Sequence, residues 1–201
     1  PYEAPIGGLV DLLANTNVDA LRVDFIGLGT TVATNALLER KGAVTGLITT
    51  KGFRDVLEIG RQRRPDVYDL FRRKPAPLIP RELRQEVDER VAGDGSVITE
   101  LNLASVLASL EQLRTQGVES IAICFLNSYA NATHEQIAAA LIREHWPEGA
   151  VSISQEVVPE FREYERLSTT AINAYLMPVM QEYLSRFTRE VGRLGFAKPP
   201  A

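Results

Sequence analysis

A cluster of hydroxyl and amide side chains near the start of the chain has the composition of a ligand-binding loop. It consists of Thr30, Thr31, Thr34 and Asn35. An apolar run precedes the cluster and helix-forming residues follow it, so the sequence predicts a strand that leads into a helix through this loop. Backbone N–H groups and hydroxyls at the start of a helix favour an anion such as phosphate. The alternative is an ordinary helix N-cap at Thr30 or Thr31.

Arg61 lies in a second candidate segment. Residues 60–66 read Gly-Arg-Gln-Arg-Arg-Pro-Asp. A guanidinium group can hold a carboxylate or a phosphate through two parallel hydrogen bonds, which would suit an anionic substrate. The alternative is a basic loop that only faces water, as runs of like charge usually do.

A third candidate segment, residues 159–170, alternates acidic and basic side chains. Arg162 and Arg166 are one helical turn apart, and Glu163 and Glu165 lie between them. Arginines beside carboxylates can form a site that binds an anion and moves a proton. Ion pairs on an exposed helix face explain the same pattern.

Asn127 and Ser128 form the fourth candidate, directly after the apolar run 121–126. This run predicts a buried strand, and open α/β sheets bind ligands beyond the carboxyl ends of their strands. An ordinary strand-to-helix turn is the alternative, because every α/β protein contains such loops.

The composition excludes several classes of protein. The 201 residues are 45% hydrophobic and 24% charged, with a net charge of -4. These values are typical of a globular domain rather than a disordered tail, and they give no reason to expect a nucleic-acid partner. No apolar run reaches the roughly 20 residues of a membrane helix, and the first residues lack the pattern of a secretory signal. We therefore expect a cytoplasmic protein that has no membrane partner.

The cysteine and histidine content argues against a metal centre. The single cysteine, Cys124, lies within an apolar run and is predicted to be a core residue rather than a nucleophile. The two histidines, His134 and His145, cannot complete a zinc site by themselves. We expect no metal site built from imidazole or thiolate ligands.

Strand and helix patterns alternate along the chain and predict an α/β fold with a mixed, mainly parallel sheet and flanking helices. The first two expected strands and the helix between them would form a βαβ unit. Asn102 should cap one helix, Thr133 with Gln136 has the spacing of a capping box, and Pro178 should either kink the last helix or open another. The expected strands are 21–28, 44–50, 121–126 and 151–154, and the expected helices include 6–14, 52–57, 102–117, 133–146 and the chain from 161 onward.

The regular pattern breaks down between residues 61 and 98. Residues 61–80 are basic and rich in proline, which suggests an excursion from the core. Residues 84–91 have the alternation of a half-exposed strand, and a turn at 93–96 would lead into a second strand. We expect 61–98 to form an irregular basic excursion and a two-stranded flap within one domain that spans 1–201.

Several segments together resemble the N-terminal region of the hydantoinase A/5-oxoprolinase family, which includes ATP-dependent N-methylhydantoinases and relatives of acetone carboxylase. The resemblance covers nearly the whole chain. It implies an actin-like ATPase (ribonuclease H-like) architecture, and the use of ATP to activate a cyclic amide such as 5-oxoproline or N-methylhydantoin for ring opening. The alternative is a piece of a related ATP-dependent ketone carboxylase. The matching segments are 29–42, 48–62, 86–90, 124–129, 159–170 and 173–175.

The chain also departs from the family pattern. Members typically begin with an Asp-x-Gly-Gly-Thr-x-Thr-Asp phosphate loop, and this chain starts at Pro1 without it. We therefore expect a piece of a longer protein that lacks this loop and the second half of the ATPase, and that is inactive alone. The family usually has histidines where Leu28 and Asn127 stand, so either an imidazole role is absent or the substrate differs.

The resemblance assigns expected roles to the candidate residues. The full-length protein would use ATP with Mg²⁺, beside the remaining ATPase domain and a second subunit of the hydantoinase B type, in an oligomer. Another hypothesis is a non-catalytic assembly half, with residues 61–80 and the flap as contact surfaces. The expected roles are ATP binding for Thr30, Thr31, Thr34 and Asn35, substrate binding for Arg61, Asn127, Ser128 and Arg166, and acid/base catalysis for Glu163 and Glu165.

Overall fold

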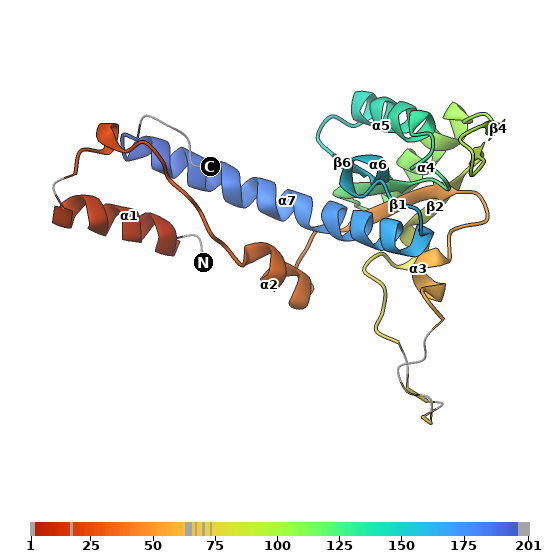
Figure 1. Ribbon diagram of the computed structural model, residues 1–201, viewed down its shortest axis with the longest axis horizontal. Coiled ribbons are helices and arrows are strands. Elements are labelled where there is room, and N and C mark those ends of the chain that lie inside the picture. Colours follow the sequence, from red (N-terminus) through yellow and green to blue (C-terminus); the bar gives the residue numbers. More distant parts are fainter. Residues whose placement is uncertain are drawn as a thin grey trace. The chain divides into compact units, whose positions relative to one another are not determined.

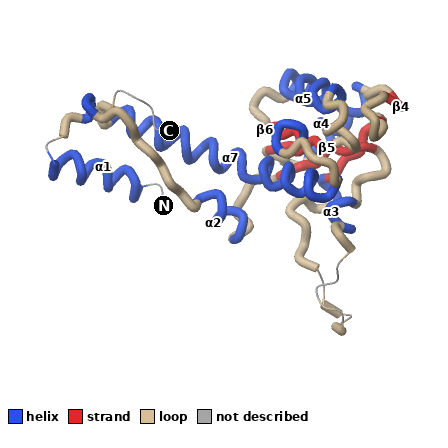
Figure 2. Tube along the Cα trace, in the orientation of Figure 1, coloured by secondary structure: helices blue, strands red, loops and turns tan. Residues whose placement is uncertain are grey.

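The computed structural model describes residues 3–16, 18–62, 66, 68–69, 71–72 and 74–196. The chain folds into two compact units, one formed by residues 1–41 and 179–201 and the other by residues 42–178. The last helix, α7 (Glu163–Arg193), contributes residues to both units. Figures 1 and 2 show the elements along the chain.

The unit of residues 42–178 is built on a four-stranded parallel sheet. Its strands lie in the order β2 (Arg84–Val87), β1 (Thr45–Thr50), β5 (Ser120–Cys124) and β6 (Ala150–Ile153). The two central strands, β1 and β5, are buried at every position, as expected for a sheet covered on both faces. The predicted α/β fold with a mainly parallel sheet is confirmed.

Helices cover the two faces of this sheet. Gly46 of β1 faces α4 (Leu103–Thr115), because a Cβ at this position would lie 2.8 Å from a side-chain atom of Leu113. Thr49 points to the opposite face, where it lines a small hollow together with Arg166 of α7. The helix α5 (Thr133–His145) lies beside α4. The core between these layers includes Leu47, Ile48, Leu110, Leu113, Ile121, Ile123, Phe125, Ile142, Ile153 and Leu167.

Short elements complete this unit. They are α3 (Val56–Ile59), the 3-10 helix Arg81–Leu83, and α6 (Ser154–Val157). The predicted helix 52–57 is therefore displaced toward α3. Much of the excursion expected at 61–80 lies outside the described residues, and its described residues contain no helix or strand.

The predicted flap is confirmed as a two-stranded antiparallel sheet of β3 (Arg90–Val91) and β4 (Val97–Thr99). Its turn uses Gly95 at a φ of 86°, a conformation that glycine adopts without a steric cost. The single strand predicted over 84–91 is wrong in extent. Its first half joins the main sheet as β2, because the edge of β1 offers a parallel hydrogen-bonding partner there.

The unit of residues 1–41 and 179–201 is helical in its described part. It contains α1 (Glu3–Thr16), the 3-10 helix Ala20–Arg22, α2 (Val32–Leu38) and the end of α7. The strand predicted at 21–28 is wrong, and so is the βαβ unit built on it. A strand needs a neighbour, and the described residues of this unit contain no strand; Phe25 is instead 71% exposed.

The predicted helix signals had mixed outcomes. Asn102 caps α4 by accepting a hydrogen bond from Ser105 N at 3.1 Å, as predicted. The capping box at Thr133 is wrong, because Thr133 is already the first helical residue and Asn131 accepts its N–H at 3.1 Å. Pro178 lies inside the single helix α7. None of the described helices combines the length and the apolar character that crossing a bilayer requires.

Candidate functional site

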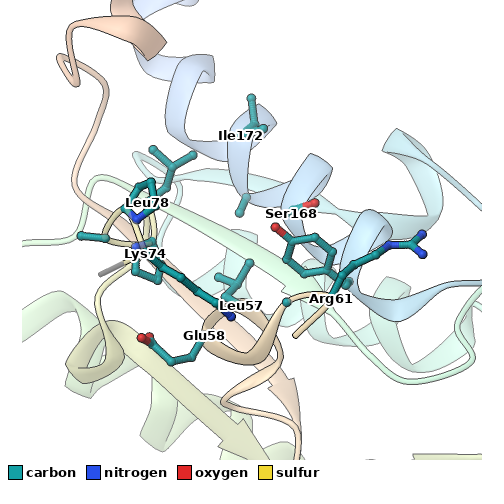
Figure 3. A pocket seen from close by; sticks show the side chains of 13 residues that line it. Leu57, Glu58, Arg61, Lys74, Leu78, Ser168 and Ile172 are labelled. Carbon is teal, nitrogen blue, oxygen red and sulfur yellow. The ribbon is translucent and has the colours of Figure 1, made fainter. Parts of the chain in front are cut away.

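A cavity of about 580 Å³ opens beside the first turns of α7 (Figure 3). Three parts of the 42–178 unit line it: residues 57–61 at the end of α3, residues 74–78, and the face of α7 that carries Tyr164, Ser168 and Ile172. Small-molecule sites have this order of volume and are lined by apolar side chains with a few polar groups. The cavity is therefore the candidate site for a small ligand.

The turn after α3 lets α7 approach the cavity closely. Gly60 has a φ of 55°, and a Cβ at this position would lie 3.5 Å from the ring of Tyr164. A side chain at residue 60 would be strained by this backbone conformation. Gly60 thus sets the direction of the chain between the end of α3 and Arg61.

Arg61, which lines the cavity, pairs with Glu165 of α7. The Arg61 Nε donates a hydrogen bond to the Glu165 carboxylate, and both side chains are partly exposed. This bond holds the pKa of Glu165 below its usual range. Glu165 is therefore a carboxylate at neutral pH, which can accept a proton but has none to donate.

The other charged side chains of the cavity also have partners. Glu58 accepts a hydrogen bond from Arg84 Nη2 at 3.1 Å. The Lys74 ammonium donates to the carbonyl oxygen of Ile59 at 3.1 Å. Both of these charged side chains therefore bond to other groups of the protein.

Arg166 lies in the interior of the unit. It is 1% exposed, and its two terminal nitrogens donate to Ser128 Oγ at 2.9 Å and to the carbonyl oxygen of Phe125 at 2.7 Å. The Ser128 hydroxyl in turn lies 3.1 Å from Ser154 Oγ, which donates to Glu135 at 2.7 Å. The structure thus brings together the predicted residues Ser128 and Arg166 at the carboxyl end of β5, facing inward.

Glu135 is fully buried, and its carboxylate joins the ends of β5 and β6. It accepts hydrogen bonds from Phe125 N at 2.8 Å and from Gln155 N at 3.0 Å, in addition to Ser154. Burial raises the pKa of this carboxyl group, and the hydrogen bonds oppose the shift. Sequence reasoning missed Glu135; the available signal was an acidic residue in the first turn of a helix that follows a buried strand.

A second buried network at the same edge was also missed. The Thr50 hydroxyl donates to the Glu89 carboxylate and accepts from Leu126 N at 2.9 Å. Glu89 also lies 2.9 Å from Nδ1 of His134, whose ring is 3% exposed. The network joins the end of β1 to the residue before β3 and to the start of α5. Glu89 lies in one of the segments that resemble the family, but nothing in its neighbours indicated burial.

The two remaining candidate residues near the end of β5 and the start of α7 are Asn127 and Glu163. Asn127 adopts a φ of 58° and donates from Nδ2 to the carbonyl oxygen of Val91 at 2.9 Å, which ties the flap to the end of β5. Asparagine tolerates this left-handed conformation better than most residues. Glu163, the first residue of α7, lines a small hollow with Arg166. Their predicted roles in ligand binding and catalysis stay predictions.

The threonine cluster belongs to the other unit. Thr31 is the N-cap residue of α2 without a side-chain capping bond, while Thr30 Oγ1 accepts from Val32 N at 3.2 Å. Asn35 Nδ2 donates to Thr31 Oγ1 at 3.4 Å. All four predicted side chains of the cluster, Thr34 included, are exposed. They present neutral donors and acceptors to solvent.

Cys124 is confirmed as a core residue at 3% exposure, and burial raises the pKa of its thiol to about 12. The thiol is thus unreactive as a nucleophile at neutral pH. Among the described residues, no group of three or more His, Cys, Asp or Glu side chains is placed to hold a metal ion.

Comparison with known proteins now identifies the family. Residues 1–146 match the hydantoinase/oxoprolinase N-terminal region. The chain belongs to this family. The assignment confirms the resemblance inferred from the sequence segments.

Several members of the hydantoinase/oxoprolinase family are similar along nearly the whole chain. An uncharacterised protein of Methanocaldococcus jannaschii is 40% identical over 197 residues, which are 96% of this chain and 29% of that protein. The caprolactamase subunit alpha of Pseudomonas jessenii is 39% identical over 194 residues, covering 95% and 28%. A 5-oxoprolinase of Dictyostelium discoideum is 33% identical over 202 residues, covering 88% and 16%.

Two solved structures share the fold. The ATP-dependent caprolactamase of Pseudomonas jessenii superposes with a TM-score of 0.88 at 37% identity, over 96% of this chain and 29% of that chain. A nucleotide-free acetone carboxylase gives a TM-score of 0.83 at 24% identity, over 96% and 30%, which shows the fold alone. This chain spans less than a third of the length of each of these relatives.

Proposed function

We propose that the protein containing this chain is an ATP-dependent hydrolase of a cyclic amide. The observation that carries the proposal is the similarity to ATP-dependent caprolactamase, at 37% identity and a TM-score of 0.88 over 96% of this chain. The 5-oxoprolinase relative supports the same substrate class. The cavity beside α7, with its apolar lining, has room for one such ring.

The proposed reaction uses ATP to activate the amide carbonyl, which is a poor electrophile. The carbonyl oxygen attacks the γ-phosphorus of ATP, and ADP leaves. Water then adds to the carbonyl carbon, and the ring C–N bond breaks as its nitrogen gains a proton, which leaves an acyl phosphate. A second water hydrolyses the acyl phosphate, and inorganic phosphate leaves. The products are the ring-opened amino acid, ADP and phosphate, and most of the rate enhancement would come from positioning and electrostatics.

The exposed threonine cluster is proposed to bind the phosphates of ATP. Its hydroxyl and amide groups are neutral donors, which suit phosphate oxygens. Mg²⁺ would accompany ATP and neutralise part of the phosphate charge. The described residues hold no cluster of metal ligands, so no step is assigned to that ion here.

Glu165 is the proposed proton acceptor for the attacking water, because it is a carboxylate on the first turn of α7 and its partner Arg61 lines the cavity. Arg61 holds the Glu165 carboxylate, so we propose that Arg61 positions this base rather than the substrate. Glu163 is proposed as a second acid/base group near Arg166. Direct substrate binding by Arg61 stays a prediction.

Arg166, Ser128 and Asn127 are proposed as positioning residues. Their polar atoms bond inside the fold, where they hold the start of α7 and the flap against the end of β5. They would act on the ligand through the elements they fix. Direct substrate binding by these residues stays a prediction.

The proposal includes partners outside this chain. One relative is named as a subunit, and this chain spans 28% of it. We propose that the chain works with the remaining part of an actin-like ATPase and with a second, hydantoinase B-type subunit, in a cytoplasmic oligomer. A purely structural role for this chain would contradict the catalytic assignments above.

The experiment is to measure ADP release by the full-length protein with its partner subunit, with and without ε-caprolactam or 5-oxoproline. Thr31→Val should lower amide-dependent turnover at least tenfold, since it removes a hydroxyl from the proposed phosphate site. Thr99→Val on the exposed β4 strand is the matched control and should leave turnover unchanged. If ADP release is stimulated only by a ketone with bicarbonate, the carboxylase alternative is favoured. Unchanged turnover in Thr31→Val would remove this residue from the proposed phosphate site.

A further inference from the structure

Two carboxylates at the base of the flap face the same histidine. The flap pairs Arg90 of β3 with Thr99 of β4, so Glu89 and Glu100 lie at the open end of the hairpin, one beside each strand. His134, in the first turn of α5, contacts both of them. Its Nδ1 is 2.9 Å from Glu89 Oε2, and its Nε2 is 3.8 Å from Glu100 Oε2. One side chain of α5 therefore contacts both ends of the flap.

The inner carboxylate, Glu89, is buried and tied to the sheet. It accepts a hydrogen bond from the hydroxyl of Thr50 at the end of β1, and Thr50 accepts from Leu126 N at 2.9 Å. A buried carboxylate needs a cation or several donors to stay ionised. In the described part of the chain, His134 is the basic side chain that pairs with Glu89.

The outer nitrogen of the ring is close to Glu100 but not hydrogen-bonded to it. Nε2 is buried and has no hydrogen-bond partner among the described residues. The Glu100 side chain is 89% exposed, so it can rotate to close the remaining distance. A neutral imidazole has one N–H, which faces Glu89 at Nδ1, and only an imidazolium has a second N–H for Glu100. A neutral ring would turn the lone pair of Nε2 toward a negative charge.

The other charged residues beside these three in the chain have partners of their own. Glu135 accepts hydrogen bonds from the turns that follow β5 and β6. Asp88 pairs with Lys51 at 2.7 Å, and the Arg90 guanidinium lies 5.0 Å from the centre of the Phe53 ring. The contacts of the imidazole with charged groups are thus those with the two flap carboxylates.

We propose that His134 is a pH-sensitive clasp that closes the base of the flap. As an imidazolium it bridges Glu89 and Glu100 and holds both ends of the hairpin against the start of α5. When the ring loses its Nε2 proton, Glu100 turns into solvent and the β4 end of the flap is released. Imidazole suits this role because its charge changes between about pH 5 and pH 8. The clasp is therefore closed at the lower pH and opens as the pH rises.

Two amide side chains hold the rest of the flap at any of these pH values. Asn127 Nδ2 donates to the carbonyl oxygen of Val91 at 2.9 Å, and Asn131 Nδ2 donates to that of Gly95 at 2.9 Å. An amide does not change its charge in this range. The flap thus stays attached to the end of β5 while its base opens.

Hydrogen exchange of the full-length protein, followed by mass spectrometry, measures this opening. Protection factors of residues 90–100, corrected for intrinsic exchange at each pH, should fall roughly threefold or more between about pH 5.5 and about pH 8. The buried strand β5 is the internal reference and should keep its protection. Equal protection of the flap at the two pH values would overturn the proposal.

Two charge-matched variants test the outer carboxylate. Glu100→Gln changes an exposed side chain and should leave the flap as open at the lower pH as at the higher one. Glu144→Gln removes the same charge from an exposed position of α5 and should keep the pH dependence of wild type. Full pH dependence in Glu100→Gln, or its loss in Glu144→Gln, would overturn the proposal.

His134→Gln tests the titrating group itself. The new amide keeps a donor for Glu89 but cannot gain a charge, so protection of the flap should no longer depend on pH. Persisting pH dependence would assign the titration to another group and overturn the proposal. If this buried substitution prevents folding, the comparison of wild type with Glu100→Gln still decides.

Discussion

At the residue scale, Glu135 is a buried carboxylate held by several parts of the 42–178 unit. Its two carboxylate oxygens accept three hydrogen bonds, from Phe125 N, Ser154 Oγ and Gln155 N. A buried acceptor with three donors around it cannot be replaced by a group that also donates without leaving one donor unpaired. Glu135 thus fixes the turns that follow β5 and β6. These turns carry Ser128, which is bonded to Arg166, and Ser154, which is bonded to Ser128.

Glu135→Gln should lower the free energy of unfolding by about 2 kcal/mol, because the new NH₂ group faces a donor and leaves a buried hydrogen bond unmade. Urea unfolding of the 201-residue chain measures this. Glu144→Gln, on an exposed position of the same helix, is the control and should change stability by less than about 0.5 kcal/mol. A loss no larger than the control's would show that the carboxylate is replaceable.

The stability difference between wild type and Glu135→Gln should also depend on pH. Burial raises the pKa of Glu135 above the ordinary glutamate value of 4.5 that applies to the unfolded chain, so the folded chain keeps this proton to higher pH. The contribution of this group to stability therefore falls as pH rises from about 4.5 to the folded pKa, and is constant above it. The stability advantage of wild type over Glu135→Gln should be smaller at pH 8 than at pH 4.5, as measured by urea unfolding. An advantage that grows with pH would mean a lowered pKa.

At the scale of elements, the first turns of α7 connect the cavity to the sheet. One face carries Tyr164 and Ser168 to the cavity, and the other buries Arg166 against the end of β5. The Arg166 guanidinium also lies 5.5 Å from the centre of the Tyr129 ring. The position of the cavity wall thus depends on bonds made by a residue that does not line it.

Arg166→Ala should lower the free energy of unfolding by about 2 to 4 kcal/mol, because it leaves the Ser128 hydroxyl and the Phe125 carbonyl oxygen without their donor. Arg162→Ala is the matched control. Arg162 is exposed and precedes the helix, so its loss should cost less than about 0.5 kcal/mol. Thermal unfolding monitored by circular dichroism compares the two. Equal losses of stability in the two variants would mean that the buried hydrogen bonds of Arg166 stabilise the fold no more than an exposed arginine does.

At the scale of the whole molecule, the chain divides into two units that hold different predicted residues. The threonine cluster belongs to the unit of residues 1–41 and 179–201, and Arg61, Glu165 and the cavity belong to the unit of residues 42–178. The chain also spans less than a third of its caprolactamase and 5-oxoprolinase relatives. The complete ATP site is therefore proposed to need residues beyond this chain.

Calorimetric titration of Mg-ATP into the 201-residue chain and into the full-length protein tests this. We expect measurable binding only by the full-length protein, because exposed hydroxyls alone supply little affinity for a hydrated triphosphate. Binding by the chain itself, abolished in Thr31→Val, would instead place phosphate affinity within the threonine cluster. The control is Thr99→Val, which should behave as wild type.

The sequence alone determined the elements whose signals are local. Apolar runs flanked by turn residues predicted the buried strands β1, β5 and β6, and Asn102 correctly marked the start of α4. Periodicity suffices there because each side chain's face follows from its own position along the element. The matching segments likewise placed the chain in its family, since these signals lie within short stretches of sequence.

Tertiary structure decided the rest, because partners distant in the chain decide whether a strand forms and where a polar side chain points. Residues 21–28 have no neighbouring strand and lie outside any sheet. Residues 84–87 pair with β1 and form the strand β2 of the main sheet. Arg166 was predicted to bind substrate, with an ion pair on an exposed helix face as the alternative, yet its guanidinium is buried against Ser128 and Phe125, about forty residues away. Nothing around Glu89 in the sequence indicated burial, and the position of Glu135 in the first turn of a helix did not by itself predict it, since a carboxylate can be buried only where the fold supplies its donors.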